Sequence, residues 1–235
     1  MINTRADFRR ASNLVYNSFL ALAFPHPCRI CGASVEEREN LPVCQDCWNR
    51  TRTFAASDAA HDFDHASCGL KISYAVGPYA RALRAAILEL KREPYVCRYL
   101  TDQILKVLAS TDAIKSAVIV PVPLYRERYV ERGFNQAEVL ARAIHSRTGM
   151  SLDTENLVRT SFTIRHRVGM DLRARRESVR GVFSLIAPDR VREKDILLVD
   201  DVMTTGATLI SCAGELVRAG AGTVSALTIA RVSAS

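Results

Sequence analysis

Short apolar runs and amphipathic segments alternate along most of the chain. The run from Ile196 to Val199 is unbroken, and AVIVP at 117–121 is similar. Runs of this length without polar alternation are typical of strands that are buried on both faces, as in a parallel sheet. Further strands are predicted over 70–77, where the pattern alternates, and over 181–186 and 223–231.

Segments with helical periodicity separate these runs. Apolar residues three and four positions apart predict helices over 79–91, 99–109 and 135–147, and another from Leu209 onward. The alternation of strands and helices predicts an α/β fold with a mainly parallel, doubly wound sheet. Ligands of such folds bind at the carboxyl ends of the strands.

The first 24 residues predict a separate helix that ends before Pro25. Its basic start and apolar continuation also resemble a signal peptide. Asn17 and Ser18 interrupt the apolar part, and no small-residue cleavage site follows. An amphipathic helix is therefore the favoured interpretation.

Length and composition limit the domain count. A chain of 235 residues with 48% hydrophobic and 24% charged residues has room for one globular α/β domain and a small appendage. We expect the N-terminal helix and a cysteine-rich module in 1–60, and the α/β domain in 61–235. The net charge of +7 suits either a phosphate-rich ligand or nucleic acid. No apolar run approaches the roughly 20 residues that cross a bilayer, so we expect no membrane span.

Four cysteines form the first candidate site. Cys28 and Cys31 make one Cys-x-x-Cys pair, and Cys44 and Cys47 make a second after twelve intervening residues. Thiolates at this spacing form tetrahedral zinc sites, and Gly32 allows the tight turn of the first pair. Four protein ligands leave no position for water, so we expect a structural Zn²⁺. Two redox pairs or four buried cysteines are the alternative. Reduced thiols in metal spacing suit the cytoplasm.

The segment that follows is less informative. Residues 49–67 are polar and weakly patterned, which predicts a linker. His61, His65 and Cys68 suggest a second metal site. His65 and Cys68 form only one of the two ligand pairs that such a site needs, and no second pair follows. We expect Cys68 to lie on or beside the strand that begins near Leu70.

Two carboxylates and a loop of small residues follow the 196–199 run. Asp200 and Asp201 are placed to accept hydrogen bonds from ribose hydroxyls or to hold a metal through water. Gly206 lets the backbone approach a ligand closely, and the loop and the next helix N-terminus present N–H groups to a phosphate. The alternative is a strand–turn–helix unit whose aspartates only solvate the end of the sheet. The predicted ligand contacts of the loop are Val202, Met203, Thr204, Thr205, Gly206, Ala207 and Thr208.

A basic loop follows a second strand end. The sequence PVPL leaves the strand at Pro121–Leu124, and three arginines precede Asn135, which we expect to cap the next helix. Arginine forks suit pyrophosphate oxygens. The three arginines are Arg126, Arg128 and Arg132. The start of a solvated basic helix is the alternative interpretation, especially for Arg126 and Arg128.

These motifs resemble known families. The stretch DILLVDDVMTTGATL, residues 195–209, resembles the 5-phosphoribosyl pyrophosphate (PRPP) motif of type I phosphoribosyltransferases. Over 25–231 the chain is similar to the ComF family, phosphoribosyltransferase-like proteins linked to DNA uptake in bacterial competence. This similarity rests on PVPL followed by RGFNQAEVLAR, on DDVMTTGATL, on the four-cysteine knuckle and on Ala230-Arg231.

The resemblance implies a zinc ribbon followed by a type I phosphoribosyltransferase fold that binds PRPP with Mg²⁺. Lys91 stands at the position of a family lysine and is expected to contact the ligand. Asp200 and Asp201 would be catalytic, because they stabilise the positive charge that develops on the ribose as pyrophosphate leaves. The implied pyrophosphate-binding residues are Pro121, Val122, Pro123, Leu124, Arg126 and Arg132.

The sequence departs from the family in the segment that forms a flexible hood over the substrate. Ile164, Arg167 and Ser178 stand where the family usually has Thr, Gln and Asn. The acceptor of the phosphoribosyl group is therefore not implied. The arginines of this segment also suit nucleic acid phosphates. A second hypothesis is a non-catalytic protein that senses a sugar phosphate and binds single-stranded DNA or a DNA-processing partner.

Overall fold

The computed structural model describes residues 26–35, 41–63, 68–111, 116–160 and 182–232. The expected helix over 1–24 lies outside these ranges, as do His65 and the hood positions Ile164, Arg167 and Ser178. No helix in the described ranges has both the length and the apolar character needed to cross a membrane.

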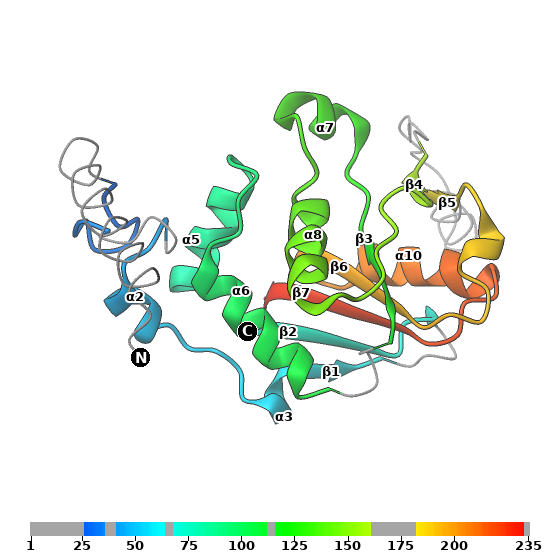
Figure 1. Ribbon diagram of the computed structural model, residues 1–235, viewed down its shortest axis with the longest axis horizontal. Coiled ribbons are helices and arrows are strands. Elements are labelled where there is room, and N and C mark those ends of the chain that lie inside the picture. The colour runs from blue at the N-terminus through cyan, green and yellow to red at the C-terminus, as the bar shows by residue number, and fades with distance from the viewer. Residues whose placement is uncertain (1–25, 36–40, 64–67, 112–115, 161–181, 233–235) are drawn as a thin grey trace, which may run out of the picture.

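A five-stranded sheet forms the centre of the molecule (Figure 1). Its strand order is β1-β2-β7-β6-β3, and only β1 runs antiparallel to its neighbour. The predicted mainly parallel sheet is therefore confirmed. The strands are β1 (Ala60–Asp62), β2 (Ile72–Pro78), β7 (Val224–Arg231), β6 (Ile196–Met203) and β3 (Val118–Pro121).

Strand β6 is longer than the apolar run predicts. It remains paired with β7 beyond Val199, through the two aspartates to Met203, which lies opposite Arg231. The helix that follows begins at Ala207, two residues before the expected start at Leu209. The carboxylates thus lie within a hydrogen-bonded strand instead of after its end, because pairing with β7 continues past the residues that local hydrophobicity marks.

Helices cover both faces of the sheet, as the alternating pattern predicts (Figure 1). One face packs against α5 (Arg81–Leu90), α6 (Arg98–Ala109) and α8 (Gln136–Thr148). The other packs against α10 (Ala207–Arg218) and a two-stranded hairpin of β4 (Leu157–Arg159) and β5 (Phe183–Leu185).

Several short elements occupy segments that the sequence pattern leaves irregular. The expected linker 49–67 contains α3 (Ala56–Ala59) and the edge strand β1, so it is part of the domain. The expected arginine loop contains the helix α7 (Arg126–Arg132), which has no buried residue. The remaining elements are α2 (Gln45–Asn49) and the 3₁₀ turn Pro188–Arg190.

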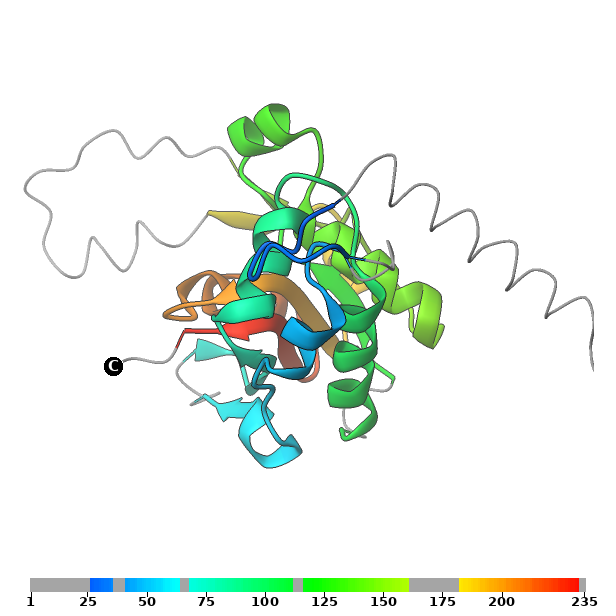
Figure 2. The same cartoon turned by 90° about the vertical axis from the view of Figure 1, so that its left-hand side faces the viewer.

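The cysteine-bearing module packs against α5 on the side of the molecule away from α10 (Figures 1 and 2). Trp48 of α2 is 1% exposed and stacks on Tyr99 of α6, with ring centroids 4.6 Å apart. Thr51 Oγ1 accepts a hydrogen bond from the Ala82 amide in the first turn of α5. Trp48 and Val43 belong to the same buried cluster as the apolar residues of α5. The module and the sheet domain therefore share one hydrophobic core.

Candidate functional site

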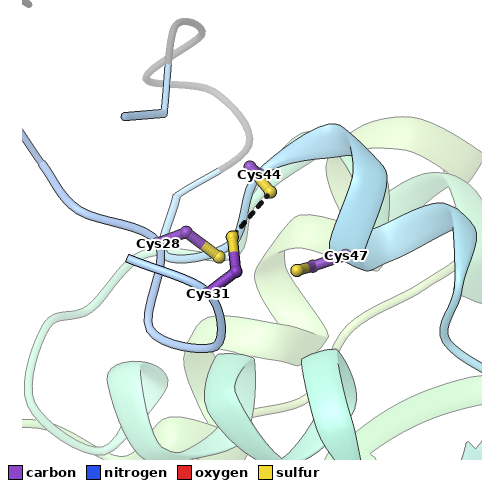
Figure 3. Close-up of side chains that lie close together, drawn as sticks. All are labelled: Cys28, Cys31, Cys44 and Cys47. Carbon is purple, nitrogen blue, oxygen red and sulfur yellow. Dashed lines mark hydrogen bonds between the residues drawn. The ribbon is translucent and has the colours of Figure 1, made fainter. Parts of the chain in front are cut away.

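The four predicted metal ligands lie together. The sulfurs of Cys28, Cys31, Cys44 and Cys47 are all within 4.8 Å of one another, as Figure 3 shows. The Sγ atoms of Cys31 and Cys44 are 3.7 Å apart. A tetrahedral zinc site with Zn–S bonds of about 2.3 Å has sulfur–sulfur edges of about 3.8 Å. The arrangement fits such a site.

Local backbone structure brings the first pair of sulfurs to this position. Gly32 has φ of +75° and donates its amide to the Cys28 carbonyl at 2.9 Å, which closes the expected tight turn. The second pair is placed by α2, because Cys44 precedes the helix and Cys47 lies within it. Among the described residues, these cysteines are the one group of three or more potential metal-binding side chains with ligand atoms this close.

The electrostatics of the cluster also favour a bound cation. Burial opposes ionisation of Cys28, but the amides of Cys31, Cys44 and Ile30 outweigh it and lower the pKa of Cys28 to about 6. Burial and the adjacent thiols raise the pKa of Cys47 to about 12. Thiolates this close repel one another, and a divalent metal removes that repulsion.

The acidic pair is joined by the predicted lysine. Lys91 follows α5, and its Nζ lies 2.8 Å from Oδ2 of Asp201. Asp201 is 6% exposed, and no hydrogen bond reaches this oxygen in the part of the chain that the structure describes. The ammonium charge therefore compensates the charge of a carboxylate oxygen that is buried and accepts no hydrogen bond from the described residues.

Asp200 has a different environment. It is half-buried, and its Oδ1 accepts a hydrogen bond from the Asp201 amide at 2.8 Å. Burial and the negative charge of Asp201 raise the pKa of Asp200 to about 8, although that amide and the Lys91 ammonium oppose the shift. Asp200 thus binds a proton more tightly than an isolated aspartate does.

The segment 204–208 leads from β6 into the first turn of α10, and its threonines, Thr204, Thr205 and Thr208, are exposed. Gly206 directly precedes the helix with φ of +76°. A Cβ atom added there would lie 3.3 Å from the Phe63 ring, which packs beside the loop. Met203 is held from the other side, because its sulfur accepts a hydrogen bond from the Ser73 hydroxyl. The loop is therefore anchored at Met203 and Gly206 while its hydroxyls remain accessible.

The second predicted loop opens at the same edge of the sheet. Pro121 lies opposite Val199 in the register of β3 and β6, and the Val122 amide donates to the Val199 carbonyl at 2.9 Å. Asn135 caps α8 by accepting a bond from the Ala137 amide, as predicted, and its Nδ2 donates to the Val122 carbonyl at 3.0 Å. The loop thus begins beside Asp200, and the N-terminus of α8 is fixed to it. Pro121 and Val122 are buried, whereas Pro123 and Leu124 are half-buried.

The three arginines differ in their surroundings. Arg132 donates to Gln136 at the start of α8, which holds it near the loop. Arg128 forms a 2.8 Å ion pair with Glu131 on the exposed surface of α7, which supports the solvated interpretation for this residue. Arg126, at the start of α7, is exposed.

Arg231 of the Ala230-Arg231 pair lies at the carboxyl end of β7. Its guanidinium donates to the Asp58 carbonyl at 3.0 Å and stacks on the Phe54 ring. It therefore fastens the 54–60 segment to the sheet. Neither Phe54 nor Phe63 is marked in the sequence, because each lies in a segment without clear periodicity and contacts a residue far along the chain.

His61 and Cys68, which suggest a second metal site in the sequence, are engaged in other contacts. His61 packs edge-on against the Phe63 ring, and the Cys68 thiol donates to the Leu70 carbonyl.

A polar groove of about 780 Å³ lies at the opposite end of the sheet, by the amino ends of β3 and β6. Its lining includes Asp153, Glu155, Glu193 and Lys194. None of the predicted ligand-binding residues lines it, so it is distinct from the candidate site.

No family model matches the chain. Among named proteins, it is 29% identical to the DNA utilization protein YhgH of Salmonella typhimurium over 221 residues, which cover 87% of this chain and 90% of that protein. It is 27% identical to competence protein F of Haemophilus influenzae over 196 residues, covering 77% and 80%. It is 34% identical to competence protein ComFC of Bacillus subtilis over 122 residues, covering 50% and 45%.

Two of the solved structures similar to the chain are of proteins whose names refer to phosphoribosyl compounds. The glutamine PRPP amidotransferase of B. subtilis aligns with a TM-score of 0.39 and 22% identity, over 55% of this chain and 26% of the other. A purine phosphoribosyltransferase of Pyrococcus horikoshii aligns with a TM-score of 0.36 and 16% identity, over 58% and 85%. The chain is a homologue of YhgH, competence protein F and ComFC, and its resemblance to the ComF family is thereby confirmed.

Proposed function

We propose that the chain binds PRPP, or a related ribose 5-phosphate ligand, at the carboxyl edge of its sheet. The main support is that β3 and β6 are adjacent and parallel. The Pro121–Leu124 loop, the acidic pair and the 204–208 loop consequently open at one edge, and α8 and α10 both begin there. Helix N-termini and flanking loops of this kind attract phosphate groups.

The residues suggest one orientation of the ligand. The 5-phosphate would bind the 204–208 loop, where the exposed hydroxyls and the first amides of α10 are donors. The ribose hydroxyls would donate to the carboxylates of Asp200 and Asp201. The pyrophosphate would then lie toward the Pro121–Leu124 loop, with Arg132 and Arg126 near it.

The proposed reaction is transfer of the phosphoribosyl group to a nitrogen nucleophile with release of pyrophosphate. As the bond to pyrophosphate breaks, positive charge develops on the ribose, and the carboxylates of Asp200 and Asp201 stabilise it. The oxygen donors of this pair suit Mg²⁺, which when bound would neutralise charge on the pyrophosphate. Lys91 limits the repulsion between the two carboxylates, so both can stay close to the sugar.

Calorimetry with PRPP and Mg²⁺ tests the binding. We expect wild-type protein to bind, and the double variant Asp200→Asn, Asp201→Asn to bind at least about tenfold more weakly, because it loses charge-assisted bonds to two hydroxyls. Equal affinity of the two proteins would refute the assignment of the pocket. Release of pyrophosphate in the presence of a panel of nucleobases tests turnover.

We also propose that the four cysteines hold a structural Zn²⁺, and we expect a cytoplasmic location because the ligands must stay reduced. Purified protein should contain about one equivalent of zinc. Cys44→Ser should lower that content strongly, whereas Cys68→Ser, outside the cluster, should not. Zinc below about half an equivalent in wild-type protein would count against the site.

The names of the relatives favour a second candidate function, in which the pocket senses a sugar phosphate without turnover and the arginines of the 165–180 segment bind single-stranded DNA or a DNA-processing protein. A mobility shift with single-stranded DNA at increasing salt tests it. Neutralising Arg173, Arg175 and Arg176, which lie outside the described residues, should weaken the shift and reduce its salt dependence. An unchanged shift would argue against this role.

A further inference from the structure

Arg159, the last residue of β4, contacts two aromatic rings. Its guanidinium carbon lies 5.0 Å from the centroid of the Tyr125 ring and 5.3 Å from that of Phe183. Phe183 is 2% exposed and lies opposite Arg159 in the register of β4 and β5. Tyr125 directly follows the Pro121–Leu124 loop. Arg159 therefore joins the hairpin to the candidate pyrophosphate loop.

This contact leaves the hydrogen-bonding edge of the guanidinium available. A cation–π contact holds the positive charge near the ring faces without using the five N–H donors of the guanidinium in conventional hydrogen bonds. Within the described residues Arg159 forms no ion pair with a carboxylate, whereas Arg128, Arg142 and Arg192 are each paired with an acidic neighbour. Arg159 is thus an oriented, solvent-accessible cation whose charge is not neutralised by the described part of the protein.

The hairpin that carries Arg159 packs on the sheet face that Asp200 shares, because Leu157 and Phe183 lie in one buried cluster with Leu198, two positions before Asp200 in β6. Cys212 of α10 is buried in the cluster between that helix and the sheet. Burial raises the pKa of Cys212, the charge of Asp200 raises it further, and the charge of Arg159 lowers it. Both charges therefore act on one buried thiol, which is consistent with their lying at the same end of the sheet.

We propose that Arg159 binds the pyrophosphate group of a PRPP-type ligand. This inference rests on the proposed function and assigns a residue to one part of that ligand. A guanidinium fork matches pairs of phosphate oxygens, and the rings of Tyr125 and Phe183 fix its direction before the ligand arrives. The 5-phosphate has its own donors on the 204–208 loop, so Arg159 contributes to binding only when the pyrophosphate is present.

Calorimetry with three ligands separates these contributions: PRPP, inorganic pyrophosphate and ribose 5-phosphate, each with Mg²⁺. We expect Arg159→Met to weaken binding of PRPP and pyrophosphate about tenfold or more and of ribose 5-phosphate less than about twofold. Arg159→Lys keeps the charge but not the fork and should fall between. Arg128→Met is the control, because Arg128 is already paired with Glu131. The Arg128→Met protein should bind all three ligands with wild-type affinity.

The outcomes distinguish this inference from the proposed function. If Arg159→Met binds PRPP and pyrophosphate as wild type does, the inference is wrong and the pocket assignment stands. If the variant loses all three ligands equally, Arg159 is structural and the inference is again wrong. If wild type binds pyrophosphate in an Arg159-dependent way but neither sugar phosphate, Arg159 is still a pyrophosphate ligand and the sugar-phosphate pocket is refuted. If wild type binds none of the three, both are refuted.

Discussion

Trp48 offers a direct test of how the cysteine-bearing module is joined to the sheet domain. Its side chain is almost fully buried, stacks on Tyr99 and belongs to the cluster that includes Leu83 and Ile87 of α5. Replacing a buried tryptophan by alanine typically costs about 3–5 kcal/mol, because transfer energy is lost and a cavity remains. With a urea dependence of about 2–3 kcal/mol per molar, Trp48→Ala should lower the unfolding midpoint by about 1–2 M.

The assay uses the fact that Trp48 is the sole tryptophan of the chain. In wild-type protein the fluorescence of Trp48 reports on the cysteine-bearing module, whereas far-ultraviolet circular dichroism reports on all helices and strands. A shared core predicts coincident urea transitions by the two probes. Circular dichroism then measures the midpoint of Trp48→Ala, and Trp48→Phe, which fills most of the space, should show a smaller decrease.

Two results would refute this reasoning. A fluorescence transition at a much lower urea concentration than the dichroism transition would show that the cysteine-bearing module unfolds independently of the sheet. An unchanged dichroism midpoint in Trp48→Ala would show that the stacking on Tyr99 adds little to the stability of the α/β domain.

Three further predictions concern the acidic edge. Gly206→Ala should lose about 1–2 kcal/mol of unfolding free energy, because alanine disfavours positive φ and its Cβ would crowd Phe63. Because the pKa of Asp200 is raised, the folded state holds a proton that the unfolded state releases above about pH 4. The unfolding free energy of wild-type protein, measured by urea titration, should therefore fall as the pH rises toward 8. Asp200→Asn should show a weaker dependence on pH. A double-mutant cycle of Lys91→Met and Asp201→Asn should give a coupling of about 1 kcal/mol, modest because the Lys91 side chain is 33% exposed.

Each of these has an internal comparison. Gly133 also has positive φ but no atom near its missing Cβ, so Gly133→Ala isolates the backbone term, and a cost as large as that of Gly206→Ala would exclude crowding by Phe63. A wild-type stability that rises between pH 5 and 8 by more than that of Asp200→Asn would contradict the direction of the Asp200 shift. Additive effects of the Lys91 and Asp201 changes would mean that their ion pair contributes nothing.

The parts of the fold that the sequence predicts are those encoded by neighbouring residues. Helical spacing predicts α6 and α8 to within a residue or two, and the side chain of Asn135 marks the start of α8. The cysteine spacing predicts the cluster of four thiols. Uninterrupted apolar runs identify β3 and the first half of β6. In each case the chemistry that fixes the structure lies within one short segment.

The parts that escape prediction depend on contacts between distant segments. The pairing that extends β6 through Asp200 is supplied by β7, and the segment that packs Phe63 beside Gly206 looks like a linker when read alone. Arg159 gains its position from Tyr125, 34 positions earlier, and from Phe183, 24 positions later. Such residues carry no local signal, because their environment exists only once the sheet has formed.

The position of β7 has a consequence for how the protein is made. This strand lies between β2 and β6, yet it is the last of the five to be synthesised. Because domains fold as units while the chain emerges from the ribosome, β2 and β6 must wait with open edges until Val224–Arg231 becomes available. Unpaired edges of this kind can associate with other chains. The nascent protein is thus most exposed to misassembly in the interval after β6 has been synthesised and before β7 follows it.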